Sequence, residues 1–228
     1  STTAWADEVS YYYIKADGTT GTAPATKITT STSLSGGWYV VDNDIDGPLT
    51  FTGNVNLIIL DNKNVTITGT DGIKITNGNL TIYGQSKGTG SLKITANGKD
   101  DISGFGVYAK KGEISINGGI LTISATNYGI ATYKDKSSSI CDITITGGRI
   151  TVTATNGIDA DGNITLGCRK GTDYIFASSY SNNVIIAGQT LIDGMNAYNN
   201  GTINDPSVLS SKILAPDLFG ISNISRSE

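Results

Sequence analysis

Short stretches of alternating apolar and polar residues recur along most of the chain. Ile, Leu or Val takes every second position in these stretches, and Thr, Ser, Asn or Lys stands between them. Gly and Asn separate one stretch from the next. Alternation of this kind is typical of β-strands that bury one face. The pattern therefore predicts many short strands and little helix.

Between residues 112 and 161 the stretches combine into a repeating unit. One copy covers 112–133 and the next covers 142–161, each with three strands separated by turns. Gly119 and Gly148 are 29 residues apart, as are Asn127 and Asn156. A three-stranded unit that repeats at this length is one coil of a triangular solenoid. The sequence predicts an all-β, single-stranded, right-handed parallel β-helix.

Looser copies of the unit precede and follow these two coils. They lie at 57–59, 65–67 and 73–75, at 80–82, 92–94 and 107–109, and at 164–166, 174–176 and 184–186. We expect a single domain with its coils over 37–187. The open ends of a solenoid expose unpaired strand edges, so residues 1–36 and 188–228 are expected to be caps.

Alignment of the inward apolar positions predicts which outward residues are neighbours on adjacent coils. The inward column is Ile73, Val107, Ile130 and Ile158. One residue further along each strand, the first outward column is Lys74, Tyr108, Ala131 and Asp159. Two residues beyond that, the second outward column is Thr76, Lys110, Tyr133 and Asp161. Aromatic rings beside charged hydrogen-bonding groups suit a sugar. We expect ligand-binding residues at Lys74, Tyr108, Lys110, Tyr133, Asp159 and Asp161. The alternative is a solvated face whose tyrosines simply favour strands.

A second candidate site is acidic. Asp42, Asp44 and Asp46 alternate before Gly47, which is the spacing of oxygen ligands in a calcium loop. The twelfth position is Gly53 instead of the usual Glu. The segment predicts a partial calcium site, and the alternative is an Asp/Gly turn between two strands.

Composition and charge limit the possible partners and location of the protein. The chain has 20 acidic and 16 basic residues, a formal charge of −4 and no basic run, so no nucleic-acid partner is expected. No stretch is long and apolar enough to predict a membrane span. Ala4 and Ala6 resemble the small-residue end of a secretory signal, so we expect a secreted or cell-surface protein.

Histidine is absent, and this excludes the serine and cysteine triads and removes the commonest zinc ligand. We expect no catalytic activity. A calcium-dependent polysaccharide lyase ranks third among the functions considered. Asp159, Asp161, Lys110 and Arg149 could hold its metal or take a proton, but no motif fixes them in those roles.

In the predicted register Cys141 and Cys168 lie too far apart for a disulfide, so both are expected to be free thiols.

Residues 147–154 and 157–166 (Gly-Gly-x-Ile-Thr-Val-Thr-Ala and Gly-Ile-x-Ala-Asp-Gly-x-Ile-Thr-Leu) resemble the rungs of clostridial carbohydrate-binding β-helix domains, which are pectate-lyase-like in fold. Residues 38–41, 56–60, 80–85 and 173–179 are similar to secreted β-helix proteins of gut Bacteroidetes and Firmicutes. The resemblance implies a bacterial protein that binds polysaccharide. In some relatives Asp residues hold calcium, which implies Asp159 and Asp161 as metal ligands here.

The sequence thus predicts a non-catalytic polysaccharide-binding β-helix module with calcium as candidate cofactor. Its expected partner is a polysaccharide or surface glycan. The alternative is a structural or adhesin stalk that contacts host or cell-surface proteins, because a solenoid is also a rigid spacer.

Overall fold

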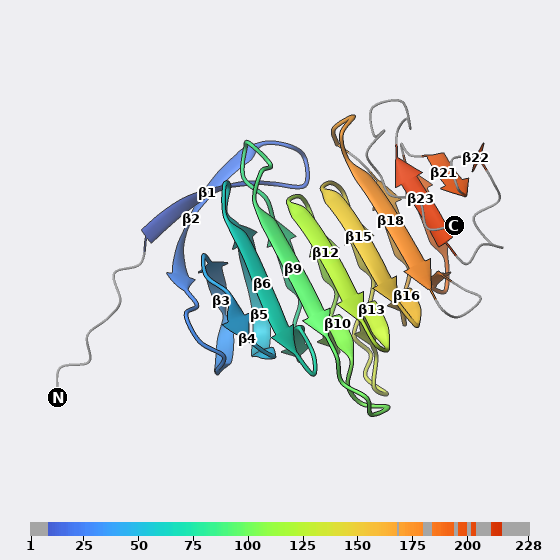
Figure 1. Ribbon diagram of the computed structural model, residues 1–228, viewed down its shortest axis with the longest axis horizontal. Helices are drawn as coiled ribbons and strands as arrows, with labels where there is room; N and C mark the ends of the chain where they lie inside the picture. Colours follow the sequence, from blue (N-terminus) through green and yellow to red (C-terminus); the bar gives the residue numbers. More distant parts are fainter. Residues whose placement is uncertain are drawn as a thin grey trace.

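The protein is a β-solenoid of about six turns built from stacked parallel strands (Figure 1). The structure is a computed structural model that describes residues 9–167, 169–179, 184–193, 196–199, 202–203 and 211–215. These residues contain no helix, which confirms the all-β prediction. Accordingly, no helix with the length and apolarity to cross a bilayer occurs among them.

Three faces form the wall of the solenoid. The first face contains β7 (Ile73–Thr76), β10 (Phe105–Lys110), β13 (Tyr128–Tyr133), β16 (Asn156–Ala160) and β19 (Ile185–Ile186). The second contains β8 (Leu80–Tyr83), β11 (Ile114–Ile116), β14 (Ile143–Ile145), β17 (Ile164–Gly167) and β20 (Thr190–Asp193). The third contains β4 (Ile45–Asp46), β6 (Asn64–Gly69), β9 (Ser91–Ala96), β12 (Ile120–Ala125), β15 (Arg149–Ala154) and β18 (Tyr174–Ser179).

The first two faces join at one long strand. β5 (Leu49–Ile59) pairs with β7 through Leu49–Thr52 and with β8 through Val55–Ile58. Gly53 lies between the two halves with a φ of 99°. That left-handed conformation favours glycine, which lets the strand bend around a corner.

The 29-residue repeat predicted from the sequence is confirmed in the strand register. Ile114 pairs with Ile143 on the second face, and Ile120 pairs with Arg149 on the third. Because side chains alternate with a period of two, a shift of one residue would turn the apolar set outward. The inward Ile and Leu positions therefore hold the register.

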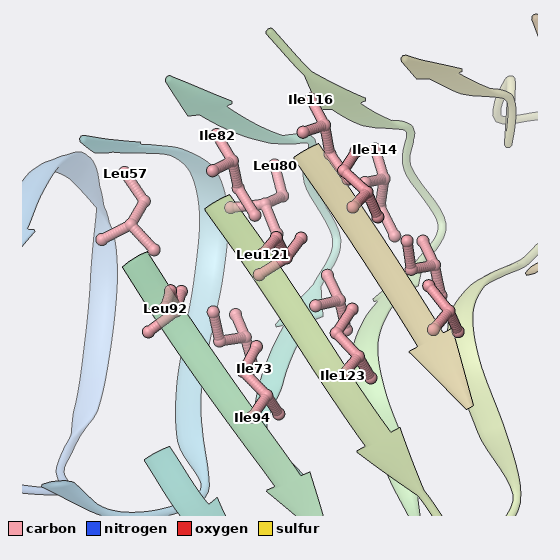
Figure 2. Close-up of a cluster of buried hydrophobic side chains, with 14 of the residues drawn as sticks. Leu57, Ile73, Leu80, Ile82, Leu92, Ile94, Ile114, Ile116, Leu121 and Ile123 are labelled. Carbon is pink, nitrogen blue, oxygen red and sulfur yellow. The ribbon is translucent and has the colours of Figure 1, made fainter. Parts of the chain in front are cut away.

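Aliphatic side chains from all three faces fill the interior (Figure 2). Ile73, Ile82 and Ile94 come from the first, second and third faces respectively, and each is fully buried. Burying such a side chain stabilises a fold by about 1.5–3 kcal/mol. Since each coil repeats the arrangement, the core is a continuous column.

The N-terminal strands cross the coils (Figure 1). β1 (Val9–Ile14) and β2 (Thr20–Lys27) form an antiparallel hairpin, and β3 (Ser33–Val41) begins the parallel stack by pairing with β2 and β5. The Tyr13 ring lies 4.7 Å from that of Trp38 and 4.6 Å from that of Tyr83, measured between centroids. This aromatic contact holds the hairpin on the outside of the wall.

The other end of the stack changes strand direction. β20 pairs in parallel with β17, so parallel stacking reaches residue 193. On the third face β23 (Ser211–Ala215) runs antiparallel to β18, and β21 (Asn196–Asn199) and β22 (Thr202–Ile203) follow it in the sheet. The last rung of that face is thus covered by a reversed strand.

Candidate ligand-binding groove

The first face brings the predicted outward columns together. Tyr108 pairs with Lys74 on one side and with Ala131 on the other, and Ala131 pairs with Asp159. In the neighbouring column Lys110 lies between Thr76 and Tyr133. The register predicted for these strands is confirmed.

Asp161 follows β16 directly and continues the second column. Its backbone N–H donates to the carbonyl oxygen of Thr132 over 3.3 Å. One carboxylate oxygen of Asp161 accepts a 2.8 Å hydrogen bond from the backbone N–H of Lys134. Asp161 is therefore held at the end of the strand beside the coil before it.

These columns line an open groove of about 690 Å³. All six residues predicted to bind a ligand lie on it: Lys74, Tyr108, Lys110, Tyr133, Asp159 and Asp161. Ala131 forms part of the floor and is almost fully buried. Since Ala131 stands between Tyr108 and Asp159 in the column, a short side chain separates two long ones.

Five further lining residues were not predicted, one of which is the buried Thr132. Phe105 and Tyr128 begin β10 and β13, where they pair with each other, and Asp101 and Ile102 belong to the segment before β10. Phe105 and Tyr128 lie two positions before the inward Val107 and Ile130, so strict alternation would have placed them in the core instead of the groove. No periodicity points to Asp101 or to Ile102, which is 79% exposed.

Three of the aromatic side chains form a cluster on the groove. The Phe105 ring stacks on Tyr108 with centroids 4.4 Å apart and on Tyr128 with centroids 5.2 Å apart. Burial, together with the nearby Tyr133 and carboxylates, raises the pKa of Tyr108 to about 12. Burial also raises the pKa of Tyr128, with a contribution from Asp159 and Asp161. Both hydroxyls are therefore hydrogen-bond donors at neutral pH.

Both lysines of the groove are paired. Lys110 Nζ lies 3.1 Å from a carboxylate oxygen of Asp135, and Lys74 Nζ lies 3.5 Å from one of Asp71. Asp71 is buried, and its other oxygen accepts a 3.0 Å hydrogen bond from the Phe105 backbone N–H. The hydrogen bond from Lys110 is the main reason that the pKa of Asp135 is lowered.

Asp159 differs from the other charged groups of the groove. Burial, with a smaller contribution from Asp161, raises the pKa of its carboxyl to about 6. Within the ranges that the structure describes, no hydrogen bond or ion pair reaches this carboxylate. Asp159 thus presents a half-buried charge that a ligand could satisfy.

The carboxylates of the predicted calcium segment have separate partners. Asp42 forms a 2.8 Å ion pair with Lys27, and Asp44 accepts a 2.8 Å hydrogen bond from the Thr66 backbone N–H. Asp46 is exposed on β4. Among the described residues no group of three or more Asp, Glu, Cys or His side chains is placed to hold a metal ion. Calcium binding here, or at Asp159 and Asp161, stays a prediction.

The residues considered for a lyase lie on different faces. Arg149 belongs to β15 on the third face, and its guanidinium donates to the carbonyl oxygen of Gly88 over 3.4 Å. Lys110 and the two aspartates line the groove on the first face. The structure therefore does not bring Arg149 together with the other three.

The strand register predicted around Cys141 is confirmed. Ile143 pairs with Ile164, and the Gly162 backbone N–H donates to the carbonyl oxygen of Cys141 over 3.0 Å. Cys141 is buried and free. Cys168 lies outside the described residues.

Comparison of the chain with family models, with curated proteins and with solved structures finds no match.

Proposed function

We propose that the protein is a non-catalytic module that binds polysaccharide in the groove of the first face. One observation carries the proposal: the aromatic cluster and several charged side chains converge on a single open groove of about 690 Å³. Sugars offer apolar C–H faces to aromatic rings and hydroxyls to polar groups. The volume lies within the usual range of about 300–1,000 Å³ for ligand sites.

The direction of the groove favours a polymer over a single small molecule. The lining residues come from β7, β10, β13 and β16, so the groove crosses four adjacent strands. Neighbouring strands are about 4.8 Å apart, so the distance across the four strands is roughly 14 Å. A short run of sugar units fits along the groove.

A bacterial protein with this activity would meet its ligand outside the cell, in keeping with a secreted or cell-surface location.

The arrangement of the carboxylates favours binding without hydrolysis. Asp159 and Asp161 are two positions apart, so both point out from the same side of the wall. A glycosidase needs two carboxyl groups on opposite sides of the scissile bond. A sugar lying on this face has both acids on one side.

Isothermal titration calorimetry tests the proposal with neutral, acidic and basic oligosaccharides, each with and without calcium. Tyr133 is 46% exposed, so its removal should have little effect on the core. Because its ring lines the groove, Tyr133→Ala should weaken binding about tenfold or more. Tyr12→Ala is the matched control, since Tyr12 is 67% exposed on β1, away from the groove. Absence of binding to every glycan would overturn the proposal, as would binding that Tyr133→Ala leaves unchanged.

Two other readouts separate the alternatives. A protein partner whose binding survives Tyr133→Ala would favour the stalk that contacts host or cell-surface proteins. Rising ultraviolet absorbance on polygalacturonate with calcium would favour the lyase, because elimination creates an unsaturated sugar end.

A further inference from the structure

The charges of the groove are not equally available to a ligand. Lys74 and Lys110 are each paired with a neighbouring aspartate, at 3.5 and 3.1 Å. An acidic sugar would have to compete with these partners for the ammonium groups. The Asp159 carboxylate has no such partner among the described residues. The unsatisfied charge of the groove is therefore negative.

The shape of the groove places a ligand next to this charge. Tyr108, Ala131 and Asp159 follow one another on β10, β13 and β16. Two strand spacings, about 9.6 Å, separate the backbones of Tyr108 and Asp159. Since Ala131 has only a methyl group, a ligand ring can lie on it between the two larger side chains. One end of that ring then faces the carboxylate.

Aromatic rings beside the carboxylate add to its preference for a cation. Tyr128 lies close enough to Asp159 for the two to influence each other electrostatically. Tyr128 also stacks on Phe105, which keeps its ring in place. The faces of such rings attract ammonium groups. Carboxylate and rings together suit a protonated amine attached to an apolar body.

We propose, resting on the proposed function, that the groove selects polysaccharides with free amino groups, such as de-N-acetylated hexosamine polymers. The amino group pairs with the Asp159 carboxylate while the sugar ring lies over Ala131. The neighbouring Asp161 increases the negative charge at this end of the groove. An N-acetylated sugar would leave Asp159 desolvated without a counter-charge, which is costly.

The test compares two hexasaccharides of equal length, one of glucosamine and one of N-acetylglucosamine, by titration calorimetry just above pH 6. Oligogalacturonate and oligolysine are the further probes. We expect the glucosamine oligomer to bind about tenfold tighter than its acetylated counterpart, as for a charge-assisted hydrogen bond. Asp159→Asn should abolish the difference, and Ala131→Leu should weaken both ligands by filling the floor.

Asp17→Asn is the matched control, because Asp17 is an exposed aspartate in the turn between β1 and β2 and does not line the groove. It should leave the preference unchanged, and melting curves by circular dichroism confirm that each variant is folded. Equal affinity for the two hexasaccharides, or tighter binding of oligogalacturonate, would overturn the amino-sugar preference and leave the polysaccharide module standing. Oligolysine binding as tightly as glucosamine would also overturn it. Failure of every glycan to bind would overturn both proposals.

Discussion

Arg169 donates a hydrogen bond to the carbonyl oxygen of Lys15 over 3.2 Å, although the two residues are 154 positions apart. The same guanidinium donates to the carbonyl oxygens of Ala16 (3.4 Å) and Asn117 (2.6 Å). It therefore ties the tip of the N-terminal hairpin to the corner between the second and third faces. Tertiary contact of this kind joins the first strands to coils much later in the chain.

We predict that Arg169→Ala lowers the free energy of unfolding by about 1–3 kcal/mol, because hydrogen bonds with a charged donor are lost and the carbonyl of the buried Asn117 loses its partner. Chemical denaturation measures the change, and hydrogen exchange locates it at the hairpin. Lys170→Ala is the control, since Lys170 is exposed. If Arg169→Ala and Lys170→Ala are equally stable, the guanidinium does not hold the hairpin.

A second prediction concerns the core. Ile123 is fully buried and comes from β12, in the middle of the stack. Ile123→Ala should cost about 2–5 kcal/mol in the free energy of unfolding, because it removes buried methyl groups and leaves a cavity. Ile140 is 65% exposed, so Ile140→Ala should change stability by about 0.5 kcal/mol or less. A similar loss in the two variants would contradict the predicted core.

A third prediction follows from the raised pKa of Asp159, about 6 in the folded protein. An unfolded aspartate titrates near 3.9, so between about pH 4 and 6 the folded state holds a proton that the unfolded state has released. The contribution of Asp159 to stability is thus present at low pH and is lost as the pH rises through 6. The groups that act on it electrostatically are Asp161, which directly follows the same strand, and Tyr128 on β13.

Asp159→Asn should remove this part of the pH dependence and should be at least as stable as the wild type near neutral pH. Denaturation at a series of pH values compares the two proteins, and carbon NMR of the carboxyl group gives its pKa directly. Asp46→Asn serves as the control. An unchanged pH dependence in Asp159→Asn would show that another group causes it.

The fourth prediction concerns calcium. The ion pair with Lys27 lowers the pKa of Asp42 and raises that of Lys27, so calcium must displace the ammonium group to reach this carboxylate. We expect the rise in melting temperature on calcium addition to be larger for Lys27→Gln than for the wild type, by mass action on a stronger site. If chelation and calcium leave both melting temperatures unchanged, the predicted calcium segment is wrong.

The strand register of the first face could be predicted from the sequence because the core determines it. Val107 and Ile130 must both point inward, which places Tyr108 beside Ala131 without further information. The same reasoning gave the neighbouring column as far as Asp161. Outward residues that alternate with regularly spaced inward apolar residues could therefore be predicted from the sequence.

The parts of the site that lie in loops and corners could not be predicted in this way. Asp101 and Ile102 precede β10 in a segment with no periodicity. Asp42 and Asp44 share a spacing, but the chain turns between the end of β3 and the start of β4, so they meet different partners. Contacts such as that of Arg169 depend on the complete fold, and local sequence contains no signal for them.

The reversed pairing of β23 with β18 has a consequence for association between molecules. A stack of parallel rungs is a template on which the first rung of another molecule could continue, giving a fibre. Ile175 of β18 instead pairs antiparallel with Leu214 of β23. Antiparallel ladders space their hydrogen bonds unevenly, whereas parallel ladders space them evenly. On the third face, the chain's own reversed strand thus occupies the edge on which another molecule would continue the parallel stack.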